Sequence, residues 1–365
     1  MHKISIVLPN LKFGGAERLH LNLAKDWIQK GFQVEFILMQ KSGEYLSLVP
    51  QGVTISCLRV NRLRWIFFPL VLCFRKSRPD IILAAMWPLT SYAIISWLLA
   101  GKIGKIYVSD HAELSFSSDC EVESSKYYLG RLIQFTYPFA NGIIAVSNRV
   151  KMDLFKTGRL KFNKIKVIYN PVALGASVIR EIQSDRIKLW GGDYAYNILT
   201  VGELKKIKDH ETLIRAFSLL PRELNEKLVI LGDGKLKGYL SQLVDQLNLC
   251  DRVNFPGFVH DPYPWYRTAN LFVLSSRSEG FGNVIVEALE CGVPVVSTDS
   301  GGPAEILDDG RYGRLTPVGD PVALSNAMMS SLKELHDHEL LIKRAQDFSV
   351  SKISQQYLDY FFKIT

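Results

Sequence analysis

The chain of 365 residues is 47% hydrophobic and contains no tandem repeat or low-complexity tract, which excludes a repeat array and favours two globular domains. Residues 1–172 carry 23 Lys and Arg against 11 Asp and Glu, a net charge of +12, whereas residues 173–365 carry 21 against 25, a net charge of −4. This asymmetry predicts an anionic partner for the first half, for which nucleic acid, a phosphorylated substrate and an anionic membrane surface all qualify.

Two successive series of apolar strands are predicted along the chain. The first comprises residues 4–8, 34–38, 81–83, 106–108, 143–146 and 167–168, with a helix over about 16–30. After a polar stretch near 184–194, the second comprises residues 198–201, 228–231, 253–255, 271–274 and 293–297. Strands that are apolar on both faces and separated by helical segments are typical of parallel sheets covered on both sides. We therefore expect two doubly wound α/β domains that face each other, with their junction near Asn170-Pro171.

Two apolar segments, residues 65–74 and 88–100, are too short to span a bilayer, which takes about 20 apolar residues. The second segment is expected to be a buried helix. The first is flanked on both sides by basic residues, namely Arg59, Arg62, Arg64, Arg75, Lys76 and Arg78. It is either a buried helix with basic ends or a segment that lies in a membrane interface, with its arginines on anionic headgroups.

The cysteines and the first residues favour the cytoplasm. Residues 1–9 lead directly into a strand, so no secretory signal is expected. Five cysteines are scattered without a C-x-x-C pair, which favours a reducing compartment and argues against structural zinc: Cys57, Cys73, Cys120, Cys250 and Cys291.

A glycine pair, Gly14-Gly15, follows the first predicted strand and precedes a helix. Glycines at this position let backbone N–H groups approach a phosphate, although a tight turn would also explain them. The pair does not form a G-x-G-x-x-G motif, so a dinucleotide-binding loop of an NAD-dependent enzyme is not predicted.

Loops at the strand ends of the second half combine cations, glycines and carboxylates. Lys205, Lys206 and Lys208 follow residues 198–201, the turn Gly232-Asp233-Gly234 follows 228–231, and Glu279 follows 271–274. Ligands of open α/β sheets bind beyond the carboxyl ends of the strands. Lysines neutralise a diphosphate and carboxylates accept hydrogen bonds from hydroxyls, so together the loops indicate a nucleotide-sugar site.

Residues 278–297 (SEGFGNVIVEALECGVPVVS) predict a helix that Asn283 caps and Gly292 ends. Asn283, Glu287 and Glu290 share one face at i, i+4 and i+7, opposite an apolar face. The glutamates either point at a ligand or form an ordinary solvated face.

The sequence resembles the retaining glycosyltransferases of family four, which have the GT-B architecture of two Rossmann-like domains around a cleft. The resemblance covers nearly the whole chain. It rests on three segments: GGAER at 14–18, IYNP at 168–171, and the Glu-x7-Glu pattern EGFGNVIVE at 279–287 followed by PVV at 294–296.

The resemblance implies roles for residues of the second half. Glu287 would hold the ribose hydroxyls and Glu279 would contact the donor sugar, while backbone N–H groups around Phe281, Gly282 and Asn283 would meet the sugar or phosphate. The loop at Gly232 and Asp233 offers open backbone for a nucleobase.

It also implies where the diphosphate binds. Gly15, beside Gly14, would bring its N–H to the diphosphate, Lys208 would neutralise it, and His111 would lie beside the transferred sugar. The family usually has arginine where this chain has Glu203; Lys205 or Lys206 compensates, or Glu203 turns away.

The function expected from the resemblance is retaining, metal-independent transfer of a hexose or N-acetylhexosamine from a UDP-sugar to a lipid-linked glycan of a surface polysaccharide, without a cofactor. Residues 1–172, joined by a helix over about 350–365, would form the acceptor domain, and residues 173–349 the donor domain. The protein would lie on the inner face of the cytoplasmic membrane.

Three other functions are considered. Glu203 leaves open a catalytically impaired nucleotide-sugar-binding protein. A GT-B nucleotide-sugar epimerase would share the architecture but not the Glu-x7-Glu pattern in this form. Nucleic acid is not an expected partner, because no recognised motif or stacking platform accompanies the basic charge.

Overall fold

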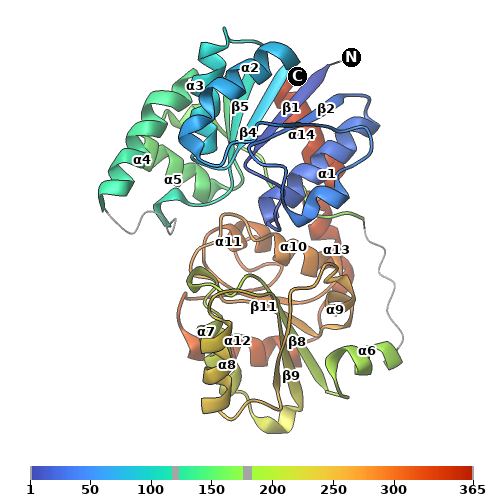
Figure 1. Cartoon of the computed structure of the whole chain (residues 1–365). Coiled ribbons are helices and arrows are strands. Elements are labelled where there is room, and N and C mark those ends of the chain that lie inside the picture. Colours follow the sequence, from blue (N-terminus) through green and yellow to red (C-terminus); the bar gives the residue numbers. More distant parts are fainter. Residues whose placement is uncertain (1, 117–122, 176–182, 364–365) are drawn as a thin grey trace. The chain divides into compact units, whose positions relative to one another are not determined.

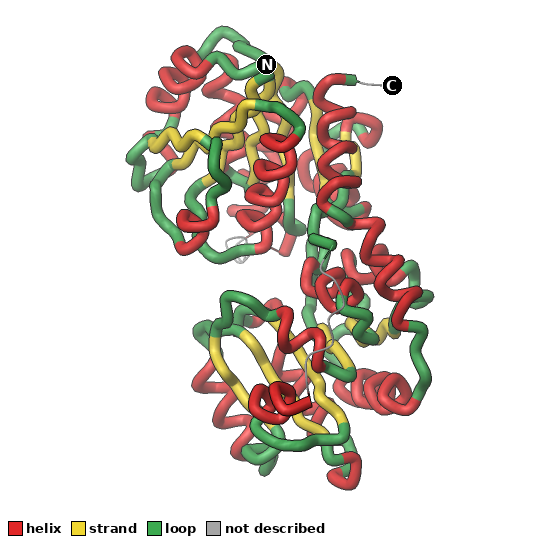
Figure 2. Tube along the Cα trace, turned by 90° about the vertical axis from the view of Figure 1, so that its right-hand side faces the viewer, coloured by secondary structure: helices red, strands yellow, loops and turns green. Residues whose placement is uncertain are grey.

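The computed structural model describes residues 2–116, 123–175 and 183–363. The chain divides into two compact units (Figure 1): unit 1 is residues 1–172 with 350–365, and unit 2 is residues 173–349. Figure 2 shows that, in each unit taken by itself, strands form a central layer with helices on both sides. The predicted fold class, two doubly wound α/β domains, is confirmed.

Unit 1 contains a seven-stranded parallel sheet in the order β3-β2-β1-β4-β5-β6-β7. Its strands are β1 Lys3–Leu8, β2 Gln33–Leu38, β3 Thr54–Cys57, β4 Ile81–Ala85, β5 Lys105–Asp110, β6 Gly142–Ala145 and β7 Ile165–Val167. Its α-helices are α1 Gly15–Gln29, α2 Phe67–Ser77, α3 Leu89–Leu99, α4 Glu123–Thr136, α5 Asn148–Gly158 and α14 Val350–Phe362. Short 3-10 helices are η1 Glu44–Leu48, η2 Leu63–Trp65, η3 Leu114–Phe116, η5 Tyr137–Phe139 and η6 Phe162–Lys164.

Unit 2 contains a six-stranded parallel sheet in the order β10-β9-β8-β11-β12-β13. Its strands are β8 Tyr196–Val201, β9 Glu226–Leu231, β10 Val253–Gly257, β11 Leu271–Leu274, β12 Val295–Thr298 and β13 Arg314–Thr316. Its α-helices are α6 Gln183–Trp190, α7 His210–Ser218, α8 Lys237–Gln246, α9 Tyr263–Thr268, α10 Asn283–Glu290, α11 Gly302–Leu307, α12 Pro321–Lys333 and α13 His338–Ala345. Its 3-10 helices are η7 Lys206–Lys208, η8 Arg222–Leu224 and η9 Gln346–Phe348.

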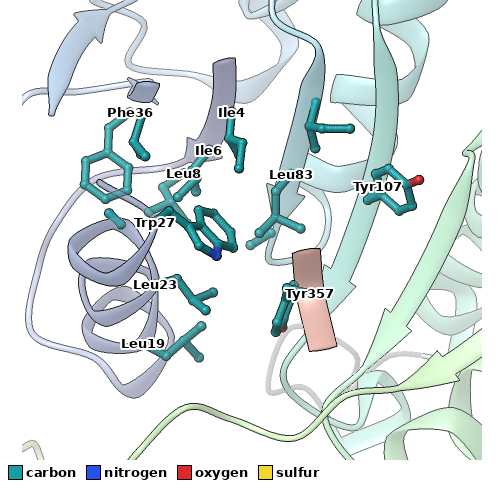
Figure 3. Packing of buried hydrophobic residues seen from close by; sticks show 14 of the residues in the cluster. Ile4, Ile6, Leu8, Leu19, Leu23, Trp27, Phe36, Leu83, Tyr107 and Tyr357 are labelled. Carbon is teal, nitrogen blue, oxygen red and sulfur yellow. The ribbon is translucent and has the colours of Figure 1, made fainter. Parts of the chain in front are cut away.

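The last helix of the chain, α14, completes the core of unit 1. Tyr357 and Phe361 of α14 pack edge-on against Trp27 of α1, with ring centroids 6.3 and 5.8 Å apart. Figure 3 shows Trp27 and Tyr357 close together, with Leu83 of β4 nearby. All four side chains are almost fully buried, and burial of each large apolar side chain contributes about 1.5–3 kcal/mol. The chain therefore returns to unit 1 after building unit 2.

The apolar segment 65–74 becomes α2 and the turn before it. Leu70 and Phe74 are fully buried, whereas Phe68 and Leu72 are 82% and 65% exposed. The alternative of a buried helix with basic ends therefore holds for the inner face of α2 only, because the outer face is exposed. Among the described residues, no helix combines the length and the apolar character needed to cross a membrane.

Candidate active site

Two loops at the carboxyl edge of the unit 2 sheet are joined to each other. The loop after β8 (residues 202–209) accepts hydrogen bonds from the loop after β11 (residues 275–282). The Ser275 hydroxyl donates to the Lys208 carbonyl at 3.1 Å, and the Arg277 N–H donates to the Ile207 carbonyl at 2.8 Å. The Arg277 side chain also pairs with the Asp209 carboxylate at 2.9 Å. The lysine loop and the first glutamate of the Glu-x7-Glu pattern therefore belong to one surface.

Lys208 and Glu279, the two catalytic residues expected in unit 2, form an ion pair. The Lys208 Nζ lies 2.5 Å from Glu279 Oε1, and the Ser276 hydroxyl donates to the same oxygen at 2.6 Å. The Lys208 side chain is 22% exposed and that of Glu279 is 10% exposed. A partly buried pair of this kind interacts more strongly than a surface pair. The ammonium is thus held in place by a carboxylate that neutralises it.

The backbone on either side of Glu279 is fixed by the loop after β12. The Glu279 N–H donates to the Ser300 carbonyl at 2.9 Å, and the Gly302 N–H donates to the Glu279 carbonyl at 3.0 Å. A Cβ at Gly302 would lie 2.3 Å from the Phe281 carbonyl oxygen, so only glycine fits there. Gly302 therefore positions Glu279, a role that sequence reasoning did not assign.

His210 is a further member of this surface that the sequence analysis did not single out. It opens α7 two residues after Lys208 and is 4% exposed. Burial, and then the charge of Lys208, lowers the pKa of His210 to about 4. The imidazole is therefore neutral at physiological pH. Its proximity to Lys208 could have suggested it, but a lone histidine has many structural explanations.

Helix α10 begins at Asn283, with Gly282 as its N-cap at φ 105° and no capping side chain. The predicted Asn283 cap is therefore wrong, because the left-handed glycine occupies the cap position and leaves Asn283 as the first helical residue. Gly292 follows the helix at φ 70°, as a C-terminal glycine should.

The two glutamates of α10 are buried, so the solvated-face alternative is wrong. Glu287 is 6% exposed and accepts a hydrogen bond from the Tyr266 hydroxyl at 3.0 Å. Glu290 is 1% exposed and accepts from the Tyr263 hydroxyl at 2.8 Å and from the Gly175 N–H at 2.7 Å. Both tyrosines belong to α9, which covers the face that periodicity assigned to solvent. The bonds of Glu290 are structural, whereas the proposed ligand contact of Glu287 stays a prediction.

Phe281, expected beside the sugar or phosphate, is a core residue. It is 2% exposed, and its ring centroid lies 5.4 Å from that of Phe348 in an edge-on contact. The side chain therefore anchors the loop. A ligand contact through the backbone around Phe281, Gly282 and Asn283 stays a prediction.

Glu203, the departure from the family pattern, pairs with Lys205 at 2.8 Å. Their side chains are 61% and 48% exposed, and an exposed pair of this kind contributes about 0–1 kcal/mol. Lys206 is exposed as well, and no carboxylate among the described residues pairs with it. Of the two lysines expected to compensate for the missing arginine, Lys206 is thus the one whose charge is not already paired.

The turn after β9 packs closely against the loop after β8. A Cβ at Gly232, which has φ 139°, would lie 2.0 Å from the Gly202 carbonyl oxygen. The Leu204 N–H donates to the Asp233 carbonyl at 2.9 Å. This contact between loops explains Gly232 without any ligand, and the nucleobase contact proposed for Gly232 and Asp233 stays a prediction.

In unit 1, Gly14 and Gly15 lead into α1 as expected, but a carboxylate already lies at this helix start. A Cβ at Gly14 would lie 2.1 Å from Glu17 Oε2. Glu17 is 7% exposed, and burial raises its pKa. A side chain at position 14 would therefore displace the Glu17 carboxylate. The diphosphate contact of Gly15 is untested.

His111 follows β5, and its ring contacts a second histidine, His20 of α1. The two ring centroids are 5.4 Å apart with the rings at 73°, and His111 Nε2 lies 3.1 Å from the Ser109 hydroxyl. Burial, followed by the repulsion of His20, lowers the pKa of half-buried His111 to about 3. His111 is thus uncharged at neutral pH and can exchange hydrogen bonds with a sugar hydroxyl. The sequence analysis did not single out His20. This residue lies in α1, one helical turn after Ala16 of the GGAER segment.

Metal ligands were not expected. Over the residues that the structure describes, no group of three or more His, Cys, Asp or Glu side chains is arranged to hold a metal ion. The four described cysteines are free thiols, and Cys120 lies outside the described residues. Metal-independent transfer stays a prediction.

Comparison with known proteins gives relatives over the full chain. A Campylobacter jejuni protein named N-acetylgalactosamine-N,N'-diacetylbacillosaminyl-diphospho-undecaprenol 4-alpha-N-acetylgalactosaminyltransferase is 29% identical over 99% of both chains. A lipopolysaccharide core biosynthesis glycosyltransferase of Rhizobium meliloti is 28% identical over 94% of this chain and 93% of its own. The crystal structure of HepE from Anabaena in complex with UDP superposes on this chain over 100% of both chains, with a TM-score of 0.82 and 23% sequence identity. This similarity shows a shared fold.

Two family models match adjoining parts of the chain. The model described as Glycosyltransferase Family 4 matches residues 13–175, and the model described as Glycosyl transferases group 1 matches residues 191–348. The structural neighbours are GT-B glycosyltransferases, which agrees with the two parallel sheets described above. The chain therefore belongs to the glycosyltransferases, with a family-four first half and a group 1 second half.

Proposed function

We propose that the protein is a retaining, metal-independent glycosyltransferase of surface polysaccharide biosynthesis. It moves a hexose or N-acetylhexosamine from a UDP-sugar to a glycan carried on a polyprenyl diphosphate. The observation that carries the proposal is the Lys208–Glu279 ion pair, held by joined loops at the carboxyl edge of the unit 2 sheet. The relative from Campylobacter jejuni acts, by its name, on a diphospho-undecaprenol acceptor, and HepE binds UDP and UDP-glucose.

The proposed roles follow the chemistry of each side chain. Lys208 stabilises the charge that grows on the departing diphosphate, Glu279 contacts the donor sugar, and Glu287 holds the ribose hydroxyls. Neutral His111 exchanges a hydrogen bond with the transferred sugar. Unit 1 receives the acceptor and unit 2 the donor, and the leaving phosphate takes the proton of the attacking hydroxyl.

Mass spectrometry of the products from a panel of UDP- and GDP-sugars with polyprenyl-diphosphate glycans tests this proposal. Nuclear magnetic resonance of the anomeric centre tests retention, and the same assay with a chelator tests metal independence. Binding of a nucleotide-sugar without turnover would instead support the binding-protein alternative. An epimerised nucleotide-sugar among the products would support the epimerase.

The two glutamates of α10 offer a test variant and a control. Glu287→Ala is expected to weaken UDP binding by roughly 10- to 150-fold, because a hydrogen bond to a charged group contributes about 1.5–3 kcal/mol. Glu290→Gln is the control, since the bonds of Glu290 go to Tyr263 and Gly175. Calorimetry with UDP measures both. Equal UDP affinity of the parent protein and folded Glu287→Ala would remove Glu287 from the donor site.

We further propose that the outer face of α2 binds an anionic membrane surface. Trp65, Phe68 and Leu72 are 66%, 82% and 65% exposed, and exposed basic side chains surround them: Arg62, Arg64, Arg75 and Lys76. Each Lys or Arg near an anionic bilayer contributes about 1 kcal/mol, and interfacial aromatic side chains add to this.

The double change Phe68→Ser/Leu72→Ser is therefore expected to abolish sedimentation with anionic vesicles. The parent protein should sediment with them at low salt and be released at high salt. Leu335→Ser is the control, because Leu335 is even more exposed, at 103%, but lies in unit 2. Failure of the parent protein to bind anionic vesicles at low salt would end the membrane proposal and leave the transferase proposal intact.

A further inference from the structure

A hollow in unit 1 lies just beyond the carboxyl end of β3, the sheet edge where ligands of parallel α/β folds bind. Its volume is about 420 Å³. Its lining includes Arg59, Asn61, Arg62, Trp65 and Pro69. No residue of the expected donor site takes part in it.

The backbone that carries the two arginines is held at several points. The Leu58 N–H donates to the Leu38 carbonyl at 2.8 Å, and the Val60 N–H donates to the Met39 carbonyl at 3.0 Å. Between these two bonds Arg59 has φ 55°, a left-handed conformation that is uncommon for residues other than glycine. The Gln40 side chain then donates to Asn61 Oδ1 at 3.0 Å. Arg59 and Arg62 are thus presented from a segment whose backbone is fixed by hydrogen bonds.

The charge around the hollow has one sign. Residues 58–78 contain six Lys and Arg and no Asp or Glu. Arg59 and Arg62 are exposed, and no carboxylate in the part of the chain that the structure describes pairs with either of them. In unit 2, by contrast, Lys205 and Lys208 are both paired. Arg59 and Arg62 therefore give the hollow a positive charge that no carboxylate of the described residues neutralises.

We propose that this hollow binds the diphosphate of the acceptor. Guanidinium groups bind phosphate oxygens in bidentate geometry, so Arg59 and Arg62 suit the two phosphates. Trp65, together with Pro69, offers apolar surface for the first carbons of the prenyl chain. The inference rests on the proposed function, which supplies the polyprenyl-diphosphate acceptor.

The strand order separates this subsite from the reacting centre. β3 lies four strands from β5, which His111 follows. Neighbouring strands are about 4.8 Å apart, so the two strands are separated by about 19 Å across the sheet. Removal of the arginines should therefore weaken acceptor binding without affecting the chemical step or the donor.

The test uses the purified full chain and a water-soluble, geranyl-diphosphate-linked oligosaccharide of N-acetylhexosamine that is long enough to bridge the distance of about 19 Å, so that no bilayer is present. Arg59→Gln/Arg62→Gln is expected to raise KM for this acceptor by at least 10-fold, since each charge-assisted contact accounts for roughly 10- to 150-fold in affinity. The values of kcat, UDP affinity and KM for the octyl glycoside of the same oligosaccharide should stay unchanged. Lys156→Gln/Lys161→Gln removes the same amount of charge from exposed positions of unit 1 that lie outside the hollow and outside α2, and should leave every constant unchanged.

Three outcomes would overturn the inference: an unchanged KM, an equal rise with the phosphate-free glycoside, or the same rise in the control variant. Loss of vesicle binding alone, with an unchanged KM for the soluble acceptor, would assign the hollow to membrane lipid instead. If the parent protein transfers no sugar, the proposed function fails. Equilibrium binding of the geranyl-diphosphate probe to the parent and to the double variant then tests the hollow separately.

Discussion

Lys208→Ala is expected to lower kcat by about 10²- to 10³-fold while changing the affinity for the nucleotide-sugar much less, because the ammonium meets charge that develops as the diphosphate leaves. The ion pair with Glu279 is part of the reason. The carboxylate fixes the position of the ammonium, so the lysine does not have to reorient as negative charge grows on the departing diphosphate. The measurement is steady-state kcat together with UDP-sugar affinity from calorimetry.

Lys205→Ala and Lys206→Ala are the matched controls in the same loop. Lys205 forms a surface pair with Glu203, and Lys206 is exposed, so turnover should fall far less in either variant. Equal, small effects of all three changes would show that the lysines are an ordinary solvated cluster.

Lys208→Ala also removes the cation beside a buried carboxylate, so its effect on folding has to be separated. Glu279 keeps the Ser276 hydroxyl as a partner, and the double variant Lys208→Ala/Glu279→Gln removes the uncompensated charge. Urea unfolding of the single and double variants measures this cost. If Lys208→Ala is fully folded under the assay conditions by its urea curve, the loss of kcat belongs to the chemistry and not to unfolding.

The sequence was sufficient to predict the two parallel sheets because nearly all their strands are apolar on both faces. It did not predict β3 and β13, which are edge strands that contain exposed or half-buried polar residues such as Thr54 and Arg314. An edge strand needs only part of its surface covered, so its composition resembles that of a loop.

At the candidate site, sequence periodicity placed Glu287 and Glu290 on one face but could not show what covers it. The tyrosine hydroxyls of α9, more than 20 residues earlier in the chain, change a solvated face into a buried hydrogen-bonded one. The Lys208–Glu279 pair likewise joins residues 71 positions apart. Such pairings depend on the register of strands and loops, which no local pattern reports.

The second large effect is expected at Asp110, the last residue of β5 and the neighbour of His111. The carboxyl group is 1% exposed, its Oδ2 accepts a hydrogen bond from the Tyr137 hydroxyl at 2.8 Å, and no hydrogen bond reaches its Oδ1. Burial raises the pKa of Asp110 from 3.8 to about 7, and the nearby Asp153 carboxylate adds to the rise, against the opposing effect of the Tyr137 bond. Near neutral pH, the folded protein therefore binds a proton at Asp110 that the unfolded chain does not.

The sign of the pH effect follows from that difference. A group whose pKa is higher in the folded state contributes its full stability below the unfolded value of 3.8 and loses it as the pH rises to about 7. Asp110→Asn removes this titration and keeps an oxygen that can accept from Tyr137. Over the roughly 1.5 pH units between 5.5 and 7, at about 1.4 kcal/mol per unit, the variant should gain about 2 kcal/mol relative to the parent protein.

Urea unfolding at pH 5.5 and at pH 8.5 measures this gain. The free energy of unfolding of Asp110→Asn relative to the parent should be higher at pH 8.5 by that amount, because the parent must there either bury a charge or hold a proton against the solvent pH. A pH-independent difference between the two proteins would mean that Asp110 is ionised in the folded state throughout. Tyr137→Phe separates the two states as well: it removes the bond that favours the ionised form, so it should cost the parent more stability at pH 8.5 than at pH 5.5.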